Sequence, residues 1–214
     1  MNSSSSLDHE LVWYASYGSN LSSRRFGCYL AGGRPPGSSR HYGGARDHSP
    51  ARRDVALELP HLLYFAGDSL VWGGAPAFLD TEPTSSHLAL ARAYLITFEQ
   101  FADVVAQENG RSVGSPLSVS HHELVPGVST ATGPGRYENL LCTGQHDGIP
   151  VVTFTAPWPM AETTPSAPSA AYLAMLIEGL RESHRLTDEQ LVSYLGAAPG
   201  SSPELVEASL GQQH

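Results

Sequence analysis

The run Tyr17-Gly18-Ser19-Asn20 is the first group of residues that could do chemistry. It ends an aromatic and apolar stretch that begins at Leu11 and is typical of a buried strand. A strand that ends in Gly and small polar residues presents successive backbone N–H groups. Such a nest can bind a carboxylate or stabilise an oxyanion without help from Lys or Arg. An ordinary strand-to-loop turn is the alternative interpretation, because tight turns use the same residue types.

Glu108 is the second candidate. Phe98, Phe101 and Val104 or Val105 precede it at helical spacing, so its carboxylate falls on or beside an apolar face. Burial of a carboxylate is costly unless the group is paired or used, and it raises the pKa towards that of a useful general base. The pattern predicts a buried base close to the Gly18–Asn20 backbone. The alternative is a solvated side chain at the frayed end of a helix.

Histidine and cysteine give no comparable pattern. The densest group is His121-His122-Glu123, and His41 and His48 lie in an Arg-rich segment. None of the ten histidines has HExxH spacing, and Cys28 and Cys142 form no CxxC pair. No GxSxG elbow supports a Ser-His-Asp triad. We therefore expect no metal ion.

The elements that must position these residues follow from periodicity and turn signals. Thr97 with Gln100, and Thr187 with Gln190, fit capping boxes that open helices. Gly67-Asp68 and Asp147-Gly148 are hairpin turn signals. Strands are expected at 11–17, 62–66, 69–73, 91–96, 136–145 and 149–157, and a further helix at 170–183. This order predicts an α+β fold, a small mixed β-barrel or curled sheet with flanking helices.

Composition predicts the domain organisation. Residues 1–10 contain four consecutive serines and are expected to be a disordered tail, residues 11–195 one domain, and residues 196–214 a flexible tail. The segment 34–54 holds five of the twelve arginines and is expected to be a surface excursion. It is interpreted either as a solvated loop or as a flap over a catalytic site.

Charge excludes several classes of function. The chain has 214 residues and a net charge of −9, and all twelve of its basic residues are Arg. Because the chain has no Lys, mechanisms that need a lysine Schiff base or a P-loop lysine are excluded. The acidic total argues against binding to nucleic acid or to an anionic membrane. No apolar run approaches a membrane span, and the first ten residues lack the order of a secretory signal. We expect a cytoplasmic protein with Cys28 and Cys142 reduced.

Five blocks, in order, resemble the gamma-glutamylcyclotransferase superfamily. WYASYGSNL (Trp13–Leu21) is similar to the opening motif YFAYGSN followed by Leu or Met. The other four are similar to a VxG strand, a helix that ends in Glu-Gly, a Tyr-led hairpin and a PSxxYL helix: Val71–Gly74, Ile96–Gly110, Gly135–Thr155 and Pro168–Leu186. The resemblance covers about residues 12–195 and points to a divergent bacterial member. The segment 34–54 has no counterpart in it.

The resemblance implies a cofactor-independent enzyme that cleaves a small-molecule gamma-glutamyl amide by cyclisation. The products would be 5-oxoproline and a free amine. It implies that Glu108 is the general acid/base and that the turn holds the glutamyl group, with a tyrosine of the last helix lining the pocket. The implied substrate-binding residues are Tyr17, Gly18, Ser19, Asn20 and Tyr172.

Three classes of function stay open. The first is this cyclotransferase. The second is an amide hydrolase or deacylase in which Glu108 activates water. The third is a catalytically silent module that binds a small molecule. The sequence predicts neither the amine side of the substrate nor the oligomeric state.

Overall fold

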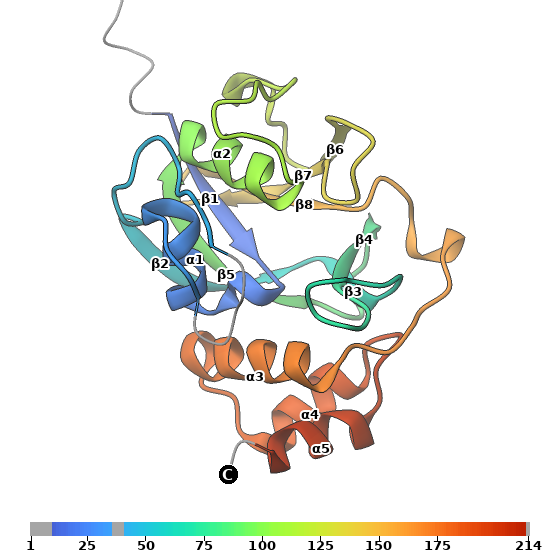
Figure 1. Cartoon of the computed structure of the whole chain (residues 1–214). Helices are drawn as coiled ribbons and strands as arrows, with labels where there is room; N and C mark the ends of the chain where they lie inside the picture. Colours follow the sequence, from blue (N-terminus) through green and yellow to red (C-terminus); the bar gives the residue numbers. More distant parts are fainter. Residues whose placement is uncertain (1–9, 36–40, 213–214) are drawn as a thin grey trace, which may run out of the picture. The chain divides into compact units, whose positions relative to one another are not determined.

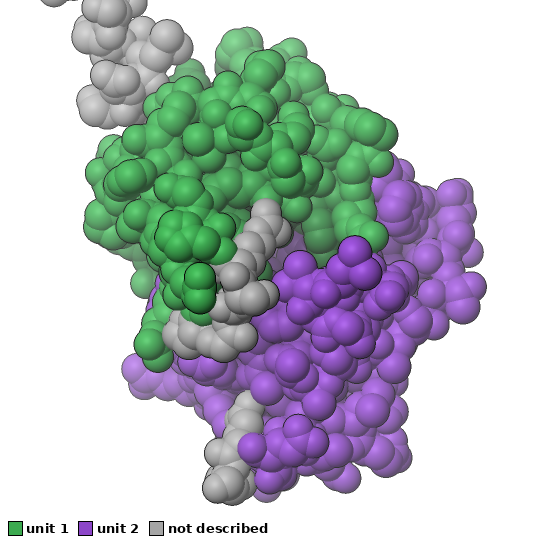
Figure 2. Space-filling view, in the orientation of Figure 1, with its two compact units in different colours: residues 1–15, 24–55, 93–154 green, residues 16–23, 56–92, 155–214 purple. Residues whose placement is uncertain are grey.

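The computed structural model describes residues 10–35 and 41–212 (Figure 1). The chain divides into two compact units, each assembled from three separate segments (Figure 2). Unit 1 comprises residues 1–15, 24–55 and 93–154, and unit 2 comprises residues 16–23, 56–92 and 155–214. The expectation of disorder at the N-terminus falls almost wholly on residues 1–9, which lie outside the described residues.

The larger sheet has six strands in the order β2-β5-β1-β8-β7-β6. β1 and β8 are parallel, with Trp13 opposite Val151, and β6 and β7 are antiparallel, with Val128 opposite Cys142. The described strands form no closed barrel, because β2 and β6 remain the two edges. The strands are β1 (Leu11–Ser16), β2 (Arg53–Leu59), β5 (Ala89–Thr97), β6 (Val128–Ala131), β7 (Asn139–His146) and β8 (Ile149–Thr155).

Helix α2 (Phe98–Glu108) lies over β1, β7 and β8 (Figure 1), and its buried Phe101, Val104 and Val105 belong to the same hydrophobic cluster as residues of these strands. Phe101 is fully buried, and its ring centroid lies 5.8 Å from that of Tyr14 and 6.2 Å from that of Phe154. The predicted capping box opens the helix: the Thr97 hydroxyl accepts the Gln100 N–H at 3.1 Å, and the Gln100 side chain accepts the Thr97 N–H at 3.1 Å. The core of unit 1 therefore fixes the direction in which α2 runs towards Glu108.

Unit 1 also contains elements that the sequence did not predict. Helix α1 (Ser23–Ala31) buries Phe26, Tyr29 and Leu30, at i, i+3 and i+4 spacing. Residues 109–135, for which the sequence predicts no strand or helix, include β6 and the short 3₁₀ helix η2 (His121–Glu123).

Unit 2 pairs a two-stranded antiparallel sheet with a layer of helices. The strands are β3 (His61–Phe65) and β4 (Ala77–Pro83), and the helices are α3 (Ala170–His184), α4 (Asp188–Gly196) and α5 (Pro203–Gly211). Helix α5 packs against both α3 and α4. The short 3₁₀ helices η1 (Ser19–Leu21) and η3 (Met160–Glu162) complete the unit, and the Thr187 capping box opens α4 as predicted.

The prediction of a strand at 69–73 is wrong. These residues form a tight turn that is closed by a bridge between Ser69 and Gly74, and β3 pairs with β4 instead. Gly67 and Gly73 both have φ of +68°, which favours glycine and ends extended structure on either side. The Ser69 carbonyl accepts the N–H groups of Trp72 and Gly73 at 3.2 and 2.7 Å, so these groups cannot join a ladder.

The prediction that residues 196–214 form a flexible tail is also wrong. All of α5 lies in this segment, with Pro203 at its first position and the Ser202 hydroxyl accepting the Leu205 N–H. Both are helix-start signals. Val206 and Leu210, one turn apart, are buried. The tail therefore belongs to the folded core of unit 2.

Candidate functional site

The Tyr17–Asn20 run lies where the sequence predicts, directly after β1. Gly18 precedes η1, and the Leu21 N–H donates to the Gly18 carbonyl at 2.9 Å. Tyr17 and Asn20 are buried, whereas Gly18 and Ser19 are half-buried. Helix α3 packs closely against this turn: a Cβ at Gly179 would collide with Leu21, so only glycine fits at position 179. The turn is therefore a fixed feature of unit 2.

Tyr172 meets this turn. The Ser169 hydroxyl accepts the Tyr172 N–H at 3.2 Å and so fixes the first turn of α3. The buried Tyr172 hydroxyl accepts the Ala77 N–H at 3.2 Å. The same oxygen lies 3.2 Å from the position that a Cβ on residue 18 would occupy. The structure thus brings together two of the predicted substrate-binding residues, and glycine at position 18 leaves room for the hydroxyl.

Glu108 is the last residue of α2 and is half-buried, so the expectation of full burial is wrong. The physical reason is its position at the end of the helix, where the next turn, at Gly110, is exposed. The expected proximity of Glu108 to the Gly18–Asn20 backbone stays a prediction, because the two belong to different units.

The carboxylate of Glu108 acts on a buried cluster that the sequence did not predict. Burial first, and then the charge of Glu108, raise the pKa of the Tyr29 hydroxyl well above its ordinary value. That hydroxyl donates to the Tyr42 hydroxyl at 3.1 Å. The Arg25 guanidinium donates to Tyr42 at 2.8 Å and is only 4% exposed. Tyr29 therefore stays protonated near a candidate base. Arg25 and Tyr29 lie on α1 and Tyr42 follows it in the chain, and no local spacing joins them to Glu108.

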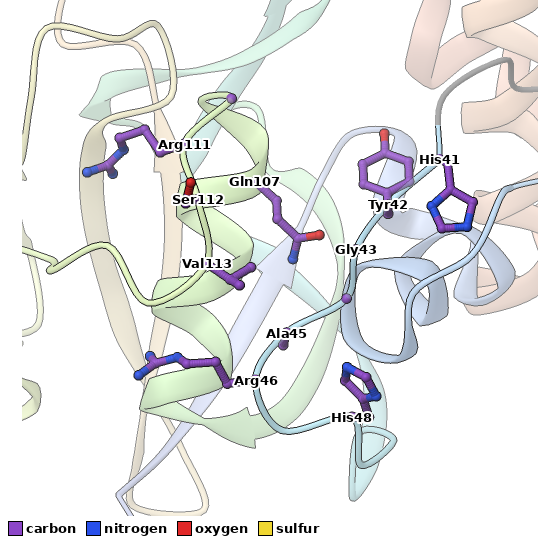
Figure 3. Close-up of a pocket in the computed structure, with 12 residues that line it drawn as sticks. His41, Tyr42, Gly43, Ala45, Arg46, His48, Gln107, Arg111, Ser112 and Val113 are labelled. Carbon is purple, nitrogen blue, oxygen red and sulfur yellow. The ribbon is translucent and has the colours of Figure 1, made fainter.

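A cavity of about 590 Å³ opens in unit 1 between the segments 41–48 and 107–113 (Figure 3). No carboxylate lines it, and Glu108 is not among its lining residues. The side chains of Arg46 and Arg111 extend to one side in Figure 3, whereas His41 and His48 stand on the opposite wall. Its lining residues are His41, Tyr42, Gly43, Gly44, Ala45, Arg46, His48, Gln107, Gly110, Arg111, Ser112 and Val113.

The two arginines of this cavity are held by carboxylates outside its lining. Arg46 binds the buried Asp103 at 3.1 Å and Glu99 at 2.7 Å, and the hydrogen bond to Asp103 raises the pKa of Arg46. Arg111 binds Glu138 at 2.9 Å. Part of the Arg-rich segment therefore forms a cavity wall that is fastened to α2.

The other candidates show no reactive geometry. Within the described residues, no group of three His, Cys, Asp or Glu side chains could hold a metal ion. His121 binds the carbonyl of Leu11 at 3.0 Å, and the Glu123 carboxylate accepts the N–H of Ser120, the N-cap of η2, at 2.9 Å. Cys28 and Cys142 are both unpaired thiols, as predicted, and burial raises the pKa of Cys142. No helix in the described part of the chain is long and apolar enough to cross a bilayer.

Comparison with known proteins identifies the fold. A solved structure of "Gamma-glutamyl cyclotransferase" is 16% identical, with a TM-score of 0.51, over 94% of this chain and 99% of that one. The chain has a gamma-glutamyl cyclotransferase-like fold. A solved structure of an uncharacterized protein from Homo sapiens is also 16% identical, with a TM-score of 0.48, over 94% of this chain and 99% of that one. The predicted mixed α+β architecture, similar to that of gamma-glutamyl cyclotransferase, is confirmed.

Sequence comparison adds one relative. The curated protein "Histone deacetylase 5" of Arabidopsis thaliana is 35% identical over 204 residues, which cover 87% of this chain and 30% of that protein. The chain therefore spans less than a third of the length of this relative. No family model matches the chain.

Proposed function

We propose that the protein cleaves gamma-glutamyl amides by intramolecular cyclisation and releases 5-oxoproline and a free amine. The observation that carries the proposal is the Tyr17–Asn20 run at the end of β1, next to Tyr172, in a chain whose fold is similar to that of gamma-glutamyl cyclotransferase. The substrate is a small molecule. The proposal invokes no metal, cofactor, nucleic acid or membrane, and it includes a cytoplasmic location.

In this reaction the α-amine of the substrate attacks the γ-carbonyl carbon. A ring C–N bond forms, and the C–N bond to the leaving amine breaks. Closure of a five-membered ring supplies an effective molarity of the order of 10⁵ M or more. The enzyme therefore needs no Ser or Cys nucleophile of its own.

Two groups of this chain would assist the reaction. Glu108 takes a proton from the attacking amine and returns one to the leaving amine. Backbone N–H groups of the Gly18–Asn20 turn stabilise the oxyanion, each worth roughly 3 kcal/mol. Tyr172 keeps its hydroxyl beside Gly18 and supports the shape of the turn. The raised pKa of Tyr29 keeps that phenol neutral, so it does not compete with Glu108 as a base.

Amide hydrolysis, with Glu108 activating water, is the second candidate. The name of the 35% identical relative favours it, although the match covers only 30% of that protein. A hydrolase would release free glutamate or another acid in place of 5-oxoproline. A silent binding module would bind the same compounds without turnover.

A panel of gamma-glutamyl dipeptides, with products measured by mass spectrometry, tests the proposal. We expect 5-oxoproline from the wild-type protein, and Glu108→Gln should lower kcat by about 10² to 10⁴-fold because the proton acceptor is lost. Glu99→Gln is the matched control, since Glu99 lies on the same helix and its side chain is 54% exposed. Circular dichroism checks that both variants fold.

Three results would contradict the proposal. Free glutamate in place of 5-oxoproline would establish the hydrolase. Binding without turnover would establish the silent module. If Glu108→Gln kept more than about a tenth of wild-type kcat, Glu108 could not be the general base; Glu138 would be the next carboxylate to test.

A further inference from the structure

The turn Ser69–Gly74 in unit 2, hereafter the apolar turn, holds large apolar side chains in solvent. Leu70 is 101% exposed and Val71 is 55% exposed. The turn is nevertheless well built: the Ser69 N–H donates to the Gly74 carbonyl at 2.9 Å, and the Gly73 N–H donates back to Ser69 at 2.7 Å. These bonds hold Leu70 and Val71 at the tip, where Leu70 gains no free energy of burial and Val71 gains only part of it.

The base of the apolar turn is fastened to the start of α3. The Ala75 N–H donates to the Ala167 carbonyl at 2.9 Å. A Cβ at Gly74 would lie 2.6 Å from the Ser169 nitrogen, so the two backbones are in close contact. Ser169 in turn caps the first turn of α3, which carries Tyr172. The position of the apolar turn relative to Tyr172 is therefore set by backbone contacts.

Trp72 is the residue of the apolar turn that contacts the candidate site. Its ring centroid lies 5.1 Å from that of Tyr172, and its side chain is half-buried. The hydroxyl of the same tyrosine reaches the space beside Gly18. Within unit 2, Gly18, Tyr172 and Trp72 therefore follow one another in contact, and the exposed side chains of Leu70 and Val71 adjoin Trp72 in the chain.

We propose that the apolar turn receives the amine half of the substrate, with Trp72 and Leu70 as its specificity-determining residues. This inference rests on the proposed function. The glutamyl half carries charged groups and suits the backbone N–H groups of the Gly18–Asn20 turn. The leaving amine lies on the other side of the scissile bond. An apolar surface favours an apolar group there, because contact with Leu70 and Trp72 removes apolar area from water, and a charged group gains nothing from such contact. The preferred substrate is therefore a gamma-glutamyl amide of an aromatic or branched aliphatic amine.

The test compares kcat/KM for four gamma-glutamyl amides, made with phenethylamine, isobutylamine, methylamine and 1,4-diaminobutane, by release of 5-oxoproline. For the wild-type protein we expect the phenethylamide to exceed the methylamide by about tenfold or more. Leu70→Ser and Trp72→Ala should bring that ratio to within about twofold of unity, and Trp72→Phe should retain most of it. Leu88→Ser is the matched control, because Leu88 is an exposed leucine of unit 2 (39%) outside the apolar turn.

The outcomes separate this inference from the proposed function. If no amide yields 5-oxoproline, both are overturned. If 5-oxoproline forms but the diaminobutane amide is preferred, or no amide is preferred, only the apolar specificity is overturned. If Leu70→Ser keeps the wild-type ratio, or Leu88→Ser changes it equally, the apolar turn is not the determinant. Leu70 is fully exposed, so its substitution tests the idea even if Trp72→Ala fails to fold.

Discussion

The contact between Gly18 and Tyr172 makes a prediction at the scale of two residues. Gly18 has φ of −111°, outside the left-handed region that favours glycine, so the main effect of Gly18→Ala is the contact that its methyl group makes. The new methyl group would lie 3.2 Å from the Tyr172 hydroxyl and displace it from the Ala77 N–H. We expect a loss of about 1 kcal/mol of stability together with a lower kcat/KM.

A double-mutant cycle checks the cause of that loss. In a Tyr172→Phe background the hydroxyl is absent, so adding Gly18→Ala should cost much less than it does in the wild-type protein. Urea unfolding and kcat/KM of the four proteins give the coupling energy. Additive losses would show that the methyl group acts somewhere other than on the tyrosine hydroxyl.

Two histidines of unit 2, the buried His61 and the half-buried His184, predict a dependence of stability on pH. Burial lowers the pKa of both His61 and His184. Hydrogen bonds to the carbonyls of Asp80 and Leu57 raise these pKa values, but they offset only part of the lowering. The unfolded chain therefore binds protons at a higher pH than the folded one, and stability falls as the pH drops below about 6.5. The urea midpoint should be lower at pH 5.5 than at pH 7.5. Replacing both histidines with Gln should flatten this dependence, whereas His87→Gln, at an exposed site, should not.

At the scale of elements, α5 offers a matched pair of substitutions. Val206 is buried and Leu205, its neighbour in the same helix, is 37% exposed. Val206→Ala should cost about 1–3 kcal/mol, because it removes buried methyl groups and leaves space behind. Leu205→Ala should stay within about 0.5 kcal/mol of wild type. Thermal unfolding distinguishes this outcome from that of a loose tail, in which the two variants would behave alike.

Elements with local signals could be predicted from the sequence. The capping boxes at Thr97 and Thr187 and the turn Asp147-Gly148 each use residues within four positions of one another, and all three occur as expected. The segment 69–73 was wrongly predicted as a strand because Leu70, Val71 and Trp72 are residue types that strands favour. Hydrogen bonds to Ser69 hold its backbone in a turn instead. Helix α1 was not predicted because two arginines and Gly27 interrupt its short apolar stripe.

At the scale of the whole molecule, strand pairing and site assembly depend on contacts that no local pattern encodes. The sequence favoured a small barrel, whereas β1 lies between β5 and β8 in a sheet with two free edges. For the candidate site, the Tyr17–Asn20 run and Tyr172 could be predicted from their motifs. The cluster of Arg25, Tyr29 and Tyr42 could not, because Tyr42 reaches the i, i+4 pair Arg25 and Tyr29 of α1 only through packing.

The parallel pairing of β1 with β8 has a consequence for synthesis on the ribosome. Trp13 is fully buried in the folded protein and lies opposite Val151, about 140 residues later. At about 5–20 residues per second, the first strand emerges roughly 7–30 s before its partner. During that interval its apolar side chains lack one of the two strands that flank them. Nascent chains that stop before β8 should therefore be the species that chaperones bind and that aggregate when translation stalls.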